Sequence, residues 1–254
     1  MTFTNLLLDA WAQGRTAFGA WCSVASPFSA EIAAASGYDY CCVDLQHGVV
    51  DYQAMVPMLQ AARLHGAAPV VRVPWREPWM VMRALDAGAH GVIVPMIDTA
   101  EQAAAMVAAC RYPPAGMRSY GPTRAAVAHG ATDPEDLARV ACILMIETEQ
   151  GLANLEAIAA TPGVDALYVG PSDLALTLGL RPGSAAGEPA HEAAIGRVRE
   201  ASERHGLVAG MHCTEGVVAA RRHAEGFRMV TVTGDAVVLR RGLVSELADA
   251  RGAP

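Results

Sequence analysis

Short runs of apolar, often β-branched residues recur along the chain, each followed by a polar or Gly/Pro turn and then by a longer stretch with helical periodicity. This alternation is typical of a parallel sheet covered by helices. We predict eight strands from these runs. They span Ala17–Ser23, Tyr40–Asp44, Pro69–Val73, Gly91–Val94, Cys142–Glu147, Ala166–Val169, Val208–Met211 and Met229–Thr233.

The stretches that separate these strands predict helices near residues 29–36, 51–65, 77–87, 99–110, 151–160, 189–205, 214–224 and 235–250. Ser29, Asp51 and Thr214 stand where residues that cap helix N-termini are expected. Six glycines fall between a helix and the next strand, where a left-handed helix end favours a residue without a side chain. They are Gly37, Gly66, Gly88, Gly163, Gly206 and Gly226. Eight strand–helix units predict a TIM (β/α)8 barrel that fills residues 1–254 as one domain.

Two segments, Arg111–Thr132 and Thr177–Pro189, lack this rhythm and are expected to be long irregular loops. Loops of this length in a compact barrel are often functional. The arginines of the first loop could bind the anionic ends of a substrate, although exposed arginines are more often simply solvated. They are Arg111, Arg118 and Arg124.

Composition narrows the class of partner. The chain of 254 residues is 52% hydrophobic and carries a formal net charge of −7, so nothing suggests a basic surface for nucleic acid or an anionic membrane. Its six cysteines form no C-x-x-C pair, as expected of reduced thiols. Neither a signal peptide nor an apolar run of about 18 residues is found. We therefore expect a cytoplasmic protein that binds small molecules and copies of itself.

Polar residues gather at the carboxyl ends of the predicted strands, where TIM barrels build their active sites. They include Asp44, Gln46 and His47 after the second strand, Arg72 in the third, Glu147 after the fifth, Gly170, Ser172 and Asp173 after the sixth, and His212 and Cys213 after the seventh.

Glu147 and Asp173 follow strands that are adjacent in sequence and therefore neighbours in a barrel. Two carboxylates in one mouth repel each other, and a hard divalent cation such as Mg²⁺ relieves that repulsion while keeping positions open for substrate oxygens. The sequence therefore favours a metal site. The alternative is that Asp173 caps a helix and that Glu147 pairs with an arginine.

His47 lies three residues beyond Asp44, a spacing that gives a base with a carboxylate to orient its imidazole. Arg72 stands in an apolar strand, where burying an unpaired guanidinium is costly. It therefore needs an anion, which is either a substrate carboxylate or a structural partner such as Asp44 or Glu147. The turn from Gly170 to Ser172 offers backbone N–H groups to a carboxylate or enolate oxygen.

Three tryptophans could form apolar walls for such a site or simply pack elsewhere. They are Trp21, Trp75 and Trp79. The chain contains no lysine, which excludes an aldolase mechanism through a lysine imine. P-loop, dinucleotide-binding, nucleophile-elbow and zincin motifs are also missing.

The ordered strand-end motifs resemble the HpcH/HpaI aldolases, the metal-dependent pyruvate aldolases of the phosphoenolpyruvate/pyruvate barrel superfamily, along nearly the whole chain. The motifs that carry the resemblance are Gly19-Ala20-Trp21, Ser29-Ala30-Glu31, Gly37-Tyr38-Asp39-Tyr40, Val43-Asp44-Leu45-Gln46-His47-Gly48, Val71-Arg72-Val73-Pro74, Asp86-Ala87-Gly88-Ala89, Gly91-Val92-Ile93-Val94-Pro95, Met145-Ile146-Glu147-Thr148 and Gly170-Pro171-Ser172-Asp173-Leu174.

This resemblance implies that Glu147 and Asp173 hold a divalent metal (Mg²⁺, Mn²⁺ or Co²⁺) and that Arg72 binds the carboxylate of pyruvate and steadies the enolate oxygen. It also implies that His47, oriented by Asp44, moves protons through water. The substrates would be pyruvate or a related 2-oxo acid and an aldehyde.

Further implications concern the rest of the pocket and the assembly. The backbone around Ser172 receives the carboxylate, Trp21 lines the pocket, and the protomers form a hexamer, a trimer of dimers, with exchanged C-terminal helices. Family members often carry Glu where Gln46 stands and Gln where Met145 stands, which leaves the contacts around the 2-oxo acid open. His212 and Cys213 fall where a residue that faces the substrate is expected, which leaves the aldehyde open.

The expected reaction is cleavage of a 4-hydroxy-2-oxo acid, such as 4-hydroxy-2-oxoheptanedioate or a 2-dehydro-3-deoxy sugar acid, to pyruvate and an aldehyde. Three alternatives stay open at this point. They are an oxaloacetate decarboxylase or macrophomate-synthase-like enzyme, a citrate-lyase-like acyl-CoA lyase, and a barrel that binds ligands without catalysis.

Overall fold

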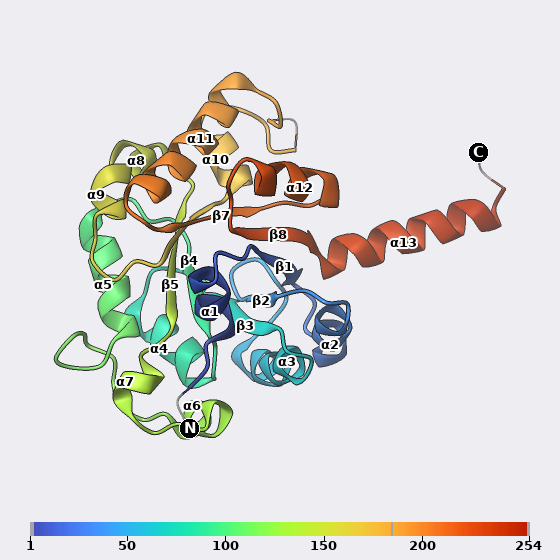
Figure 1. The fold of residues 1–254 in the computed structure, drawn as a ribbon. Coiled ribbons are helices and arrows are strands. Elements are labelled where there is room, and N and C mark those ends of the chain that lie inside the picture. The colour runs from blue at the N-terminus through green and yellow to red at the C-terminus, as the bar shows by residue number, and fades with distance from the viewer. Residues whose placement is uncertain (1–2, 184, 253–254) are drawn as a thin grey trace.

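The structure, a computed structural model, describes residues 3–183 and 185–252. Eight parallel strands follow one another around a closed barrel, in which β1 also pairs with β8 (Figure 1). Their bounds are β1 Ala17–Cys22, β2 Tyr40–Asp44, β3 Ala68–Arg72, β4 Gly91–Val94, β5 Ala141–Ile146, β6 Ala166–Val169, β7 Val208–His212 and β8 Met229–Gly234. The predicted TIM barrel is confirmed, and each predicted strand end lies within one residue of the observed end.

Helices surround the barrel. They are α1 Leu6–Ala12, α2 Pro27–Ala35, α3 Tyr52–Leu64, α4 Pro78–Asp86, α5 Ala100–Cys110, α6 Thr123–His129, α7 Pro134–Leu137, α8 Glu149–Ala153, α9 Leu155–Ala159, α10 Pro171–Thr177, α11 Pro189–Arg204, α12 Gly216–Ala224 and α13 Asp235–Ala250. The helix predicted near 151–160 is divided into α8 and α9, and α1, α6, α7 and α10 were not predicted. The segment 111–132 is therefore not wholly irregular, because it contains α6. Within the described ranges, no helix has the length and apolar character needed to cross a membrane.

The caps of two helices differ from those predicted. Asp51 caps α3 as expected, since its side chain accepts a hydrogen bond at 2.8 Å from the backbone three residues on. Helix α2 is capped by Ser26 rather than Ser29, because a proline at the first helical position starts the helix earlier. Helix α12 begins after Glu215 without a side-chain cap, so the predicted cap at Thr214 is wrong. All six predicted helix-end glycines have positive φ angles.

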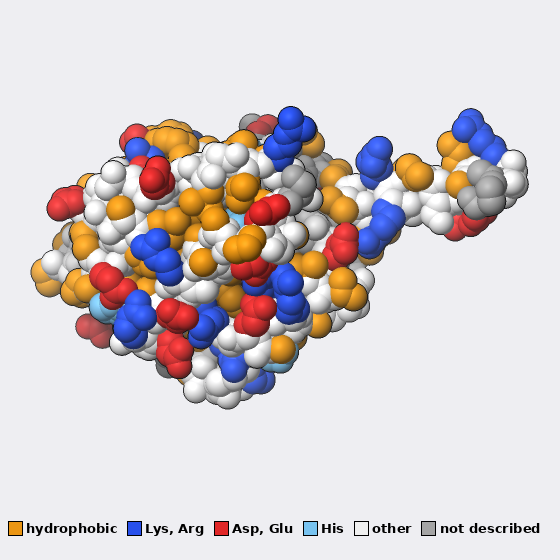
Figure 2. Space-filling model, turned by 90° about the horizontal axis from the view of Figure 1, so that it is seen from above, with side chains coloured by type: hydrophobic (Ala, Val, Ile, Leu, Met, Phe, Trp, Pro, Cys, Tyr) orange, Lys and Arg blue, Asp and Glu red, His pale blue; other side chains and the backbone are white. Residues whose placement is uncertain are grey.

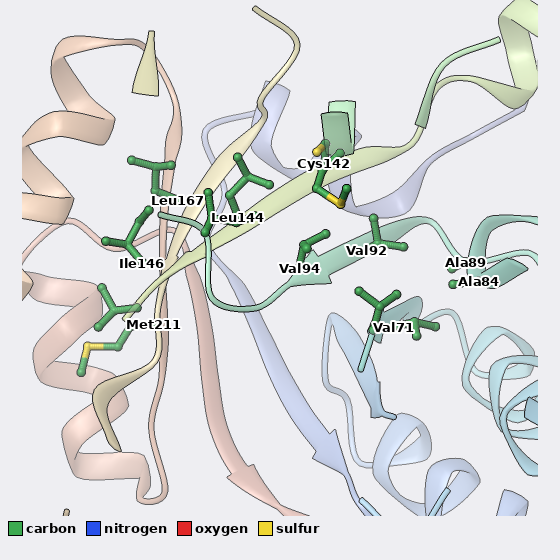
Figure 3. Packing of buried hydrophobic residues seen from close by; sticks show 14 of the residues in the cluster. Val71, Ala84, Ala89, Val92, Val94, Cys142, Leu144, Ile146, Leu167 and Met211 are labelled. Atoms are coloured by element: carbon green, nitrogen blue, oxygen red, sulfur yellow. The ribbon is translucent and has the colours of Figure 1, made fainter. Parts of the chain in front are cut away.

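Side chains of the strands alternate between the inside of the barrel and the layer under the helices. On β2, Tyr40 and Cys42 belong to the inner apolar cluster, whereas Cys41 and Val43 belong to the outer one. Figure 3 shows part of the outer cluster, including Val92 on β4. The same alternation directs the last residue of β2 and the last residue of β3, which are partners in register, towards the mouth of the barrel.

Two tyrosines fill the middle of the barrel. The hydroxyl groups of Tyr40 and Tyr168 both share hydrogen bonds with Oγ1 of Thr231, at 2.9 Å and 2.6 Å. Each ring occupies the space next to a glycine, since a Cβ at Gly19 would overlap the Tyr40 ring and a Cβ at Gly210 would overlap the Tyr168 ring. These glycines allow large aromatic side chains to form the floor under the active site.

Helix α1 closes the opposite, N-terminal end of the barrel. Leu7 packs in the inner cluster, and Asn5 is fully buried at the N-cap of α1. The amide of Asn5 donates to the carbonyl groups of His90 and Arg139, both at 2.7 Å. Among the described residues, the interior of the barrel is therefore left open at the end formed by the carboxyl termini of the strands.

Helix α13 extends away from the barrel (Figures 1 and 2). None of its 16 residues is buried, although it carries several large apolar side chains. Its first residue, Asp235, accepts hydrogen bonds from the backbone N–H of Ser23 and the hydroxyl of Ser29, both at 2.9 Å. The base of the helix is thus fixed to the loop that follows β1, while the remainder lies in solvent.

Candidate active site

A cavity of about 250 Å³ opens at the carboxyl ends of the strands. It is lined by Trp21, Ser23, His47, Arg72, Met145, Glu147, Gly170, Pro171, Ser172, Asp173, His212, Thr214, Gly234, Ala236 and Val237. The residues predicted at the strand ends to act in catalysis, bind substrate or hold a metal all line this cavity except Asp44, which lies buried directly behind it. Residues from distant parts of the sequence are therefore brought to one place by the barrel.

Arg72 and Asp44 form a bidentate ion pair at the mouth of the barrel. Nε of Arg72 donates to Oδ1 of Asp44 at 2.8 Å and Nη2 donates to Oδ2 at 2.5 Å. Nε1 of Trp21 donates to the same carboxylate at 3.1 Å, and the guanidinium lies 4.8 Å from the centre of the indole ring. This arrangement fixes the arginine at the edge of the cavity by hydrogen bonds, charge and a cation–π contact.

The electrostatic balance of the pair keeps both members charged. Burial alone would raise the pKa of Asp44, but the hydrogen bonds and positive charge of Arg72 lower it below its ordinary value. Burial likewise disfavours the charged guanidinium, and the contacts with Asp44 outweigh this and raise the pKa of Arg72. The interpretation of Arg72 as half of a structural ion pair is therefore borne out, without closing the site to a substrate anion.

Asp44 does not orient the imidazole of His47 in the way the spacing suggested. In the described ranges, its carboxylate is engaged by Arg72, Trp21 and the backbone N–H groups of Gln46 and His47, the last at 3.3 Å. The predicted carboxylate–imidazole pair is corrected accordingly. The contact to the backbone positions the loop, and the imidazole is left exposed at the rim of the cavity.

Glu147 is held in the cavity by the backbone at the end of β4. Its Oε1 accepts a hydrogen bond at 2.9 Å from the N–H of Met96, whose φ of 58° is unusual for a residue other than glycine. Nη1 of Arg76 donates to the carbonyl of Met96 at 3.1 Å and supports this conformation. On its other side Glu147 requires a glycine, because a Cβ at Gly170 would overlap Oε2.

The two predicted metal ligands create an excess of negative charge. Burial and, to a smaller extent, the charge of Asp173 raise the pKa of Glu147 to about 7, against the opposing effect of the Met96 hydrogen bond. No group of three or more His, Cys, Asp or Glu side chains suited to a metal is found in residues 3–183 and 185–252. Two carboxylates facing a cavity with room for other oxygen donors nevertheless fit Mg²⁺-like cations, which usually retain several waters.

His212 lines the same cavity and lies edge-on to Trp21, with ring centres 4.7 Å apart. Burial and the positive charge of Arg72 together lower the pKa of His212 to about 4. The imidazole is therefore neutral near pH 7 and can donate or accept a hydrogen bond to a group in the cavity.

The arginines of the segment 111–132 do not reach this cavity. Arg111 bonds to the carbonyl of Val140, which precedes β5, and Arg118 forms a buried ion pair with Asp86 at 2.8 Å. Both contacts lie at the N-terminal end of the barrel, so the proposed role of these arginines in binding substrate at this cavity is wrong. Trp75 and Trp79 are largely exposed and also lie outside the lining.

Several residues of the site were not predicted. Met96 supplies the backbone donor to Glu147, Ser23 and Thr214 add hydroxyl groups to the wall, and the first turn of α13 contributes Ala236 and Val237. Met96, Ser23 and Thr214 follow β4, β1 and β7, so their position at strand ends was a signal in the sequence. The contribution of α13 depends on how the last strand leads into the helix, which the sequence pattern does not reveal.

Comparisons with known proteins agree with this geometry. The family model of the HpcH/HpaI aldolase/citrate lyase family matches residues 17–241. The hydroxypyruvate/pyruvate aldolase of Rhizorhabdus wittichii is 37% identical over 248 residues, which cover 97% of this chain and 99% of the relative. The 5-keto-4-deoxy-D-glucarate aldolase of Klebsiella pneumoniae is 37% identical over 98% of this chain and 97% of its own.

A solved structure from Burkholderia cenocepacia, described as an HpcH/HpaI aldolase/citrate lyase family protein, superposes with a TM-score of 0.90 at 36% sequence identity. The match covers 98% of this chain and 100% of that one. With a barrel, a cavity and relatives of matching length all in agreement, the chain belongs to the HpcH/HpaI aldolase/citrate lyase family.

Proposed function

We propose that this protein is a carbon–carbon lyase that uses a divalent metal to cleave a 4-hydroxy-2-oxo acid into pyruvate, or a related 2-oxo acid, and an aldehyde. The observation that carries the proposal is the convergence of Arg72, Glu147 and Asp173 on one cavity. Positive and negative groups thus line one space that suits a small oxo acid. The names of the two relatives, both aldolases, support the same reaction class.

Glu147 and Asp173 would hold the metal, for which Mg²⁺, Mn²⁺ and Co²⁺ are candidates. When bound, such a cation supplies Lewis-acid stabilisation of the negative charge that develops on the oxo acid. The protein prepares this position through the Met96 N–H, which fixes one oxygen of Glu147, and through Gly170, which leaves space for the other.

Arg72 binds an oxygen of the oxo acid in the same cavity. Its Nε and Nη2 are engaged by Asp44, so Nη1 remains for the keto or carboxylate oxygen of the substrate. Because the ion pair is buried and fixed before substrate arrives, its field acts without reorganisation when charge develops. Backbone N–H groups at Ser172, next to Gly170, are a second place for the carboxylate.

His47 moves the proton of the C4 hydroxyl, directly or through a water. It lies at the rim of the cavity, where the carbon chain beyond C3 would extend. His212 and Trp21 form the wall beside that chain and contact the aldehyde half.

Pyruvate release from a 4-hydroxy-2-oxo acid tests the function. We expect activity that is abolished by exhaustive chelation, restored by Mg²⁺ or Mn²⁺, and lost in Glu147→Ala. Activity that survives chelation undiminished would contradict the metal assignment. Turnover of oxaloacetate without any aldol cleavage would instead favour a decarboxylase.

We also propose that α13 is exchanged between protomers in a homo-oligomer, with a trimer of dimers as the expected assembly. The exposed apolar residues of α13 include Leu239, Leu243 and Leu247. On the barrel, α2 and α12 flank the seam between β1 and β8 and expose Phe28 and Val217, at 67% and 75% of their surface. Apolar groups on both sides are suited to cover each other across two copies.

Light scattering with and without Leu243→Glu/Leu247→Glu tests this assembly. The unmodified chain is expected to be hexameric and the variant smaller, because two charges would be buried at the interface. A monomeric unmodified chain rules out the exchange.

A further inference from the structure

A second hollow, of about 390 Å³, lies between α3 and α6 at the end of the barrel opposite the active site. It is lined by Gln60, Arg63, Leu64, Arg124, Val127 and Ala128. Arg63 occupies the last turn of α3, and helices in this fold run back from the catalytic end, so their last turns face away from the substrate. Neither arginine serves the proposed reaction.

Arg63 makes its hydrogen bond to a neutral partner. Nη1 of Arg63 lies 3.2 Å from Nδ1 of His129, a buried residue of α6. Burial and the charges of Arg63, Arg118 and Arg124 lower the pKa of His129 to about 3, so the ring stays neutral and accepts this bond. The contact satisfies one N–H of the guanidinium but leaves its charge uncompensated.

Arg124 is even less satisfied. Its Nη1 is buried and has no hydrogen-bond partner in the described part of the chain. The guanidinium packs against the backbone of Gly88, where an added Cβ would stand 2.6 Å from Nη1. A buried N–H without a partner costs about 1 to 3 kcal/mol, a cost that a turn of the guanidinium towards an acceptor in the hollow would relieve.

The two arginines also lack a counter-charge. Within residues 3–183 and 185–252, neither forms an ion pair with a carboxylate, and the neighbouring Arg118 is already paired with Asp86. The positive charge of Arg63, together with burial, lowers the pKa of Arg124. The C-terminus of α3 offsets only about half a charge through its dipole, so an excess of positive charge remains.

We propose that the α3–α6 hollow is a binding site for a dianionic oxyanion group, such as the phosphoryl group of a small metabolite. The planar forks of Arg63 and Arg124 are suited to phosphoryl oxygens, and both arginines line the hollow without an ion pair to a carboxylate of the described residues. Leu64 and Val127 are 73% and 83% exposed at the edge of the hollow and give an apolar surface to the rest of the molecule.

Inorganic phosphate is the probe. The metal-loaded protein is titrated with phosphate at constant ionic strength, with chloride as the balancing anion, and binding is followed by calorimetry and by the midpoint of thermal unfolding. We expect saturable binding and a rising midpoint for the unmodified protein, and about a tenfold or greater loss of affinity in Arg63→Gln/Arg124→Gln.

A charge-matched control separates a site from general attraction. Arg15→Gln/Arg199→Gln removes the same net charge from arginines that already have carboxylate partners, so it is expected to bind phosphate as the unmodified protein does. Without phosphate, Arg63→Gln/Arg124→Gln is expected to be no less stable than the unmodified protein, because losing the two positive charges relieves the repulsion between them. Equal phosphate affinity in both double variants, or no saturable binding to the unmodified protein, overturns the proposal.

Discussion

Arg72 divides its guanidinium between the protein and the cavity. Two of its nitrogens hold Asp44, and the residue also lines the cavity where the oxo acid is proposed to bind. A lysine could keep the charge but could not hold both carboxylate oxygens and still present a donor in a fixed direction. The function of this residue therefore depends on its shape as much as on its charge.

The substitution Arg72→Lys is expected to reduce kcat/KM for pyruvate release by roughly 100-fold, because losing charge-assisted contacts costs about 2 to 3 kcal/mol. Steady-state kinetics with a 4-hydroxy-2-oxo acid measure this effect. Arg199→Lys, on the outer surface of α11, is the matched control and should leave kcat/KM unchanged. If both variants behave alike, the fork at Arg72 has no role in the reaction.

Gly170 is a second residue whose shape decides the chemistry. In Gly170→Ala the new Cβ would overlap Oε2 of Glu147 and lie 2.9 Å from the Cε of Met145, so the carboxylate must move. We expect metal affinity, measured by calorimetry, to fall about tenfold or more.

Gly196, in the middle of α11, serves as the control for that change because nothing lies within 4 Å of its added Cβ. Gly196→Ala is expected to retain metal affinity and to raise the free energy of unfolding by about 0.5 to 1 kcal/mol. Unchanged metal binding in Gly170→Ala would show that Glu147 tolerates displacement.

Most of the cavity could be anticipated from residue types at strand ends, since a barrel places every strand end around one mouth. The partner of Asp44 could not be anticipated, because His47 and Arg72 are both plausible and the choice between them depends on the register of β2 against β3. The observed register aligns Asp44 with Arg72, and both point inward. The place of Met96 after β4 was a signal, but its role as a donor to Glu147 was not, since a backbone N–H carries no signature in the sequence.

At the level of elements, strands were predicted to within one residue because each is a short, mostly apolar run bounded by turns. The short helices were missed for a physical reason. Helices of four to seven residues, such as α7 and α10, are not stable from local propensity and depend on tertiary contacts. Helix α1 was missed despite a readable signal, an asparagine cap before three leucines.

The cap of α1 gives a prediction for the closed end of the barrel. Asn5→Ala removes the cap and leaves the carbonyl groups of His90 and Arg139 without their amide donor. The free energy of unfolding is expected to fall by about 2 to 4 kcal/mol. Urea denaturation followed by circular dichroism provides the measurement.

Ser26→Ala is the reference for a cap without such cross-links, because Ser26 makes a single capping bond at 3.2 Å to Ser29. Its expected cost is about 1 kcal/mol. A loss in Asn5→Ala no larger than this would mean that the two carbonyl contacts add nothing to stability.

For the whole molecule, buried neutral histidines predict how stability depends on pH. Burial lowers the pKa of His129 to about 3, against an ordinary value of 6.5. As pH falls below 6.5 the unfolded chain binds this proton before the folded one does, so stability decreases down to the folded pKa. From about pH 7.5 to about pH 5.5 the loss for this residue is roughly 1 kcal/mol.

Urea unfolding at fixed protein concentration and a series of pH values measures this dependence. The curve for His129→Gln is expected to be flatter than that of the unmodified protein by the amount given above. Parallel curves would indicate that His129 is already protonated, or accessible to protons, in the folded state. His90, whose pKa is also lowered to about 3 by burial, should behave similarly.

The two tyrosines in the floor of the barrel restrict which substitutions the protein can accept in evolution. The ring of Tyr40 fills the space beside Gly19, and the ring of Tyr168 fills the space beside Gly210. A larger residue at either glycine would clash with the ring, and a smaller residue at either tyrosine would leave a void. Positions 19 and 40 are therefore expected to covary among related sequences, as are positions 210 and 168. A lineage that enlarges position 19 must first lose the ring at position 40, and with it one of the hydroxyl groups that meet at Thr231.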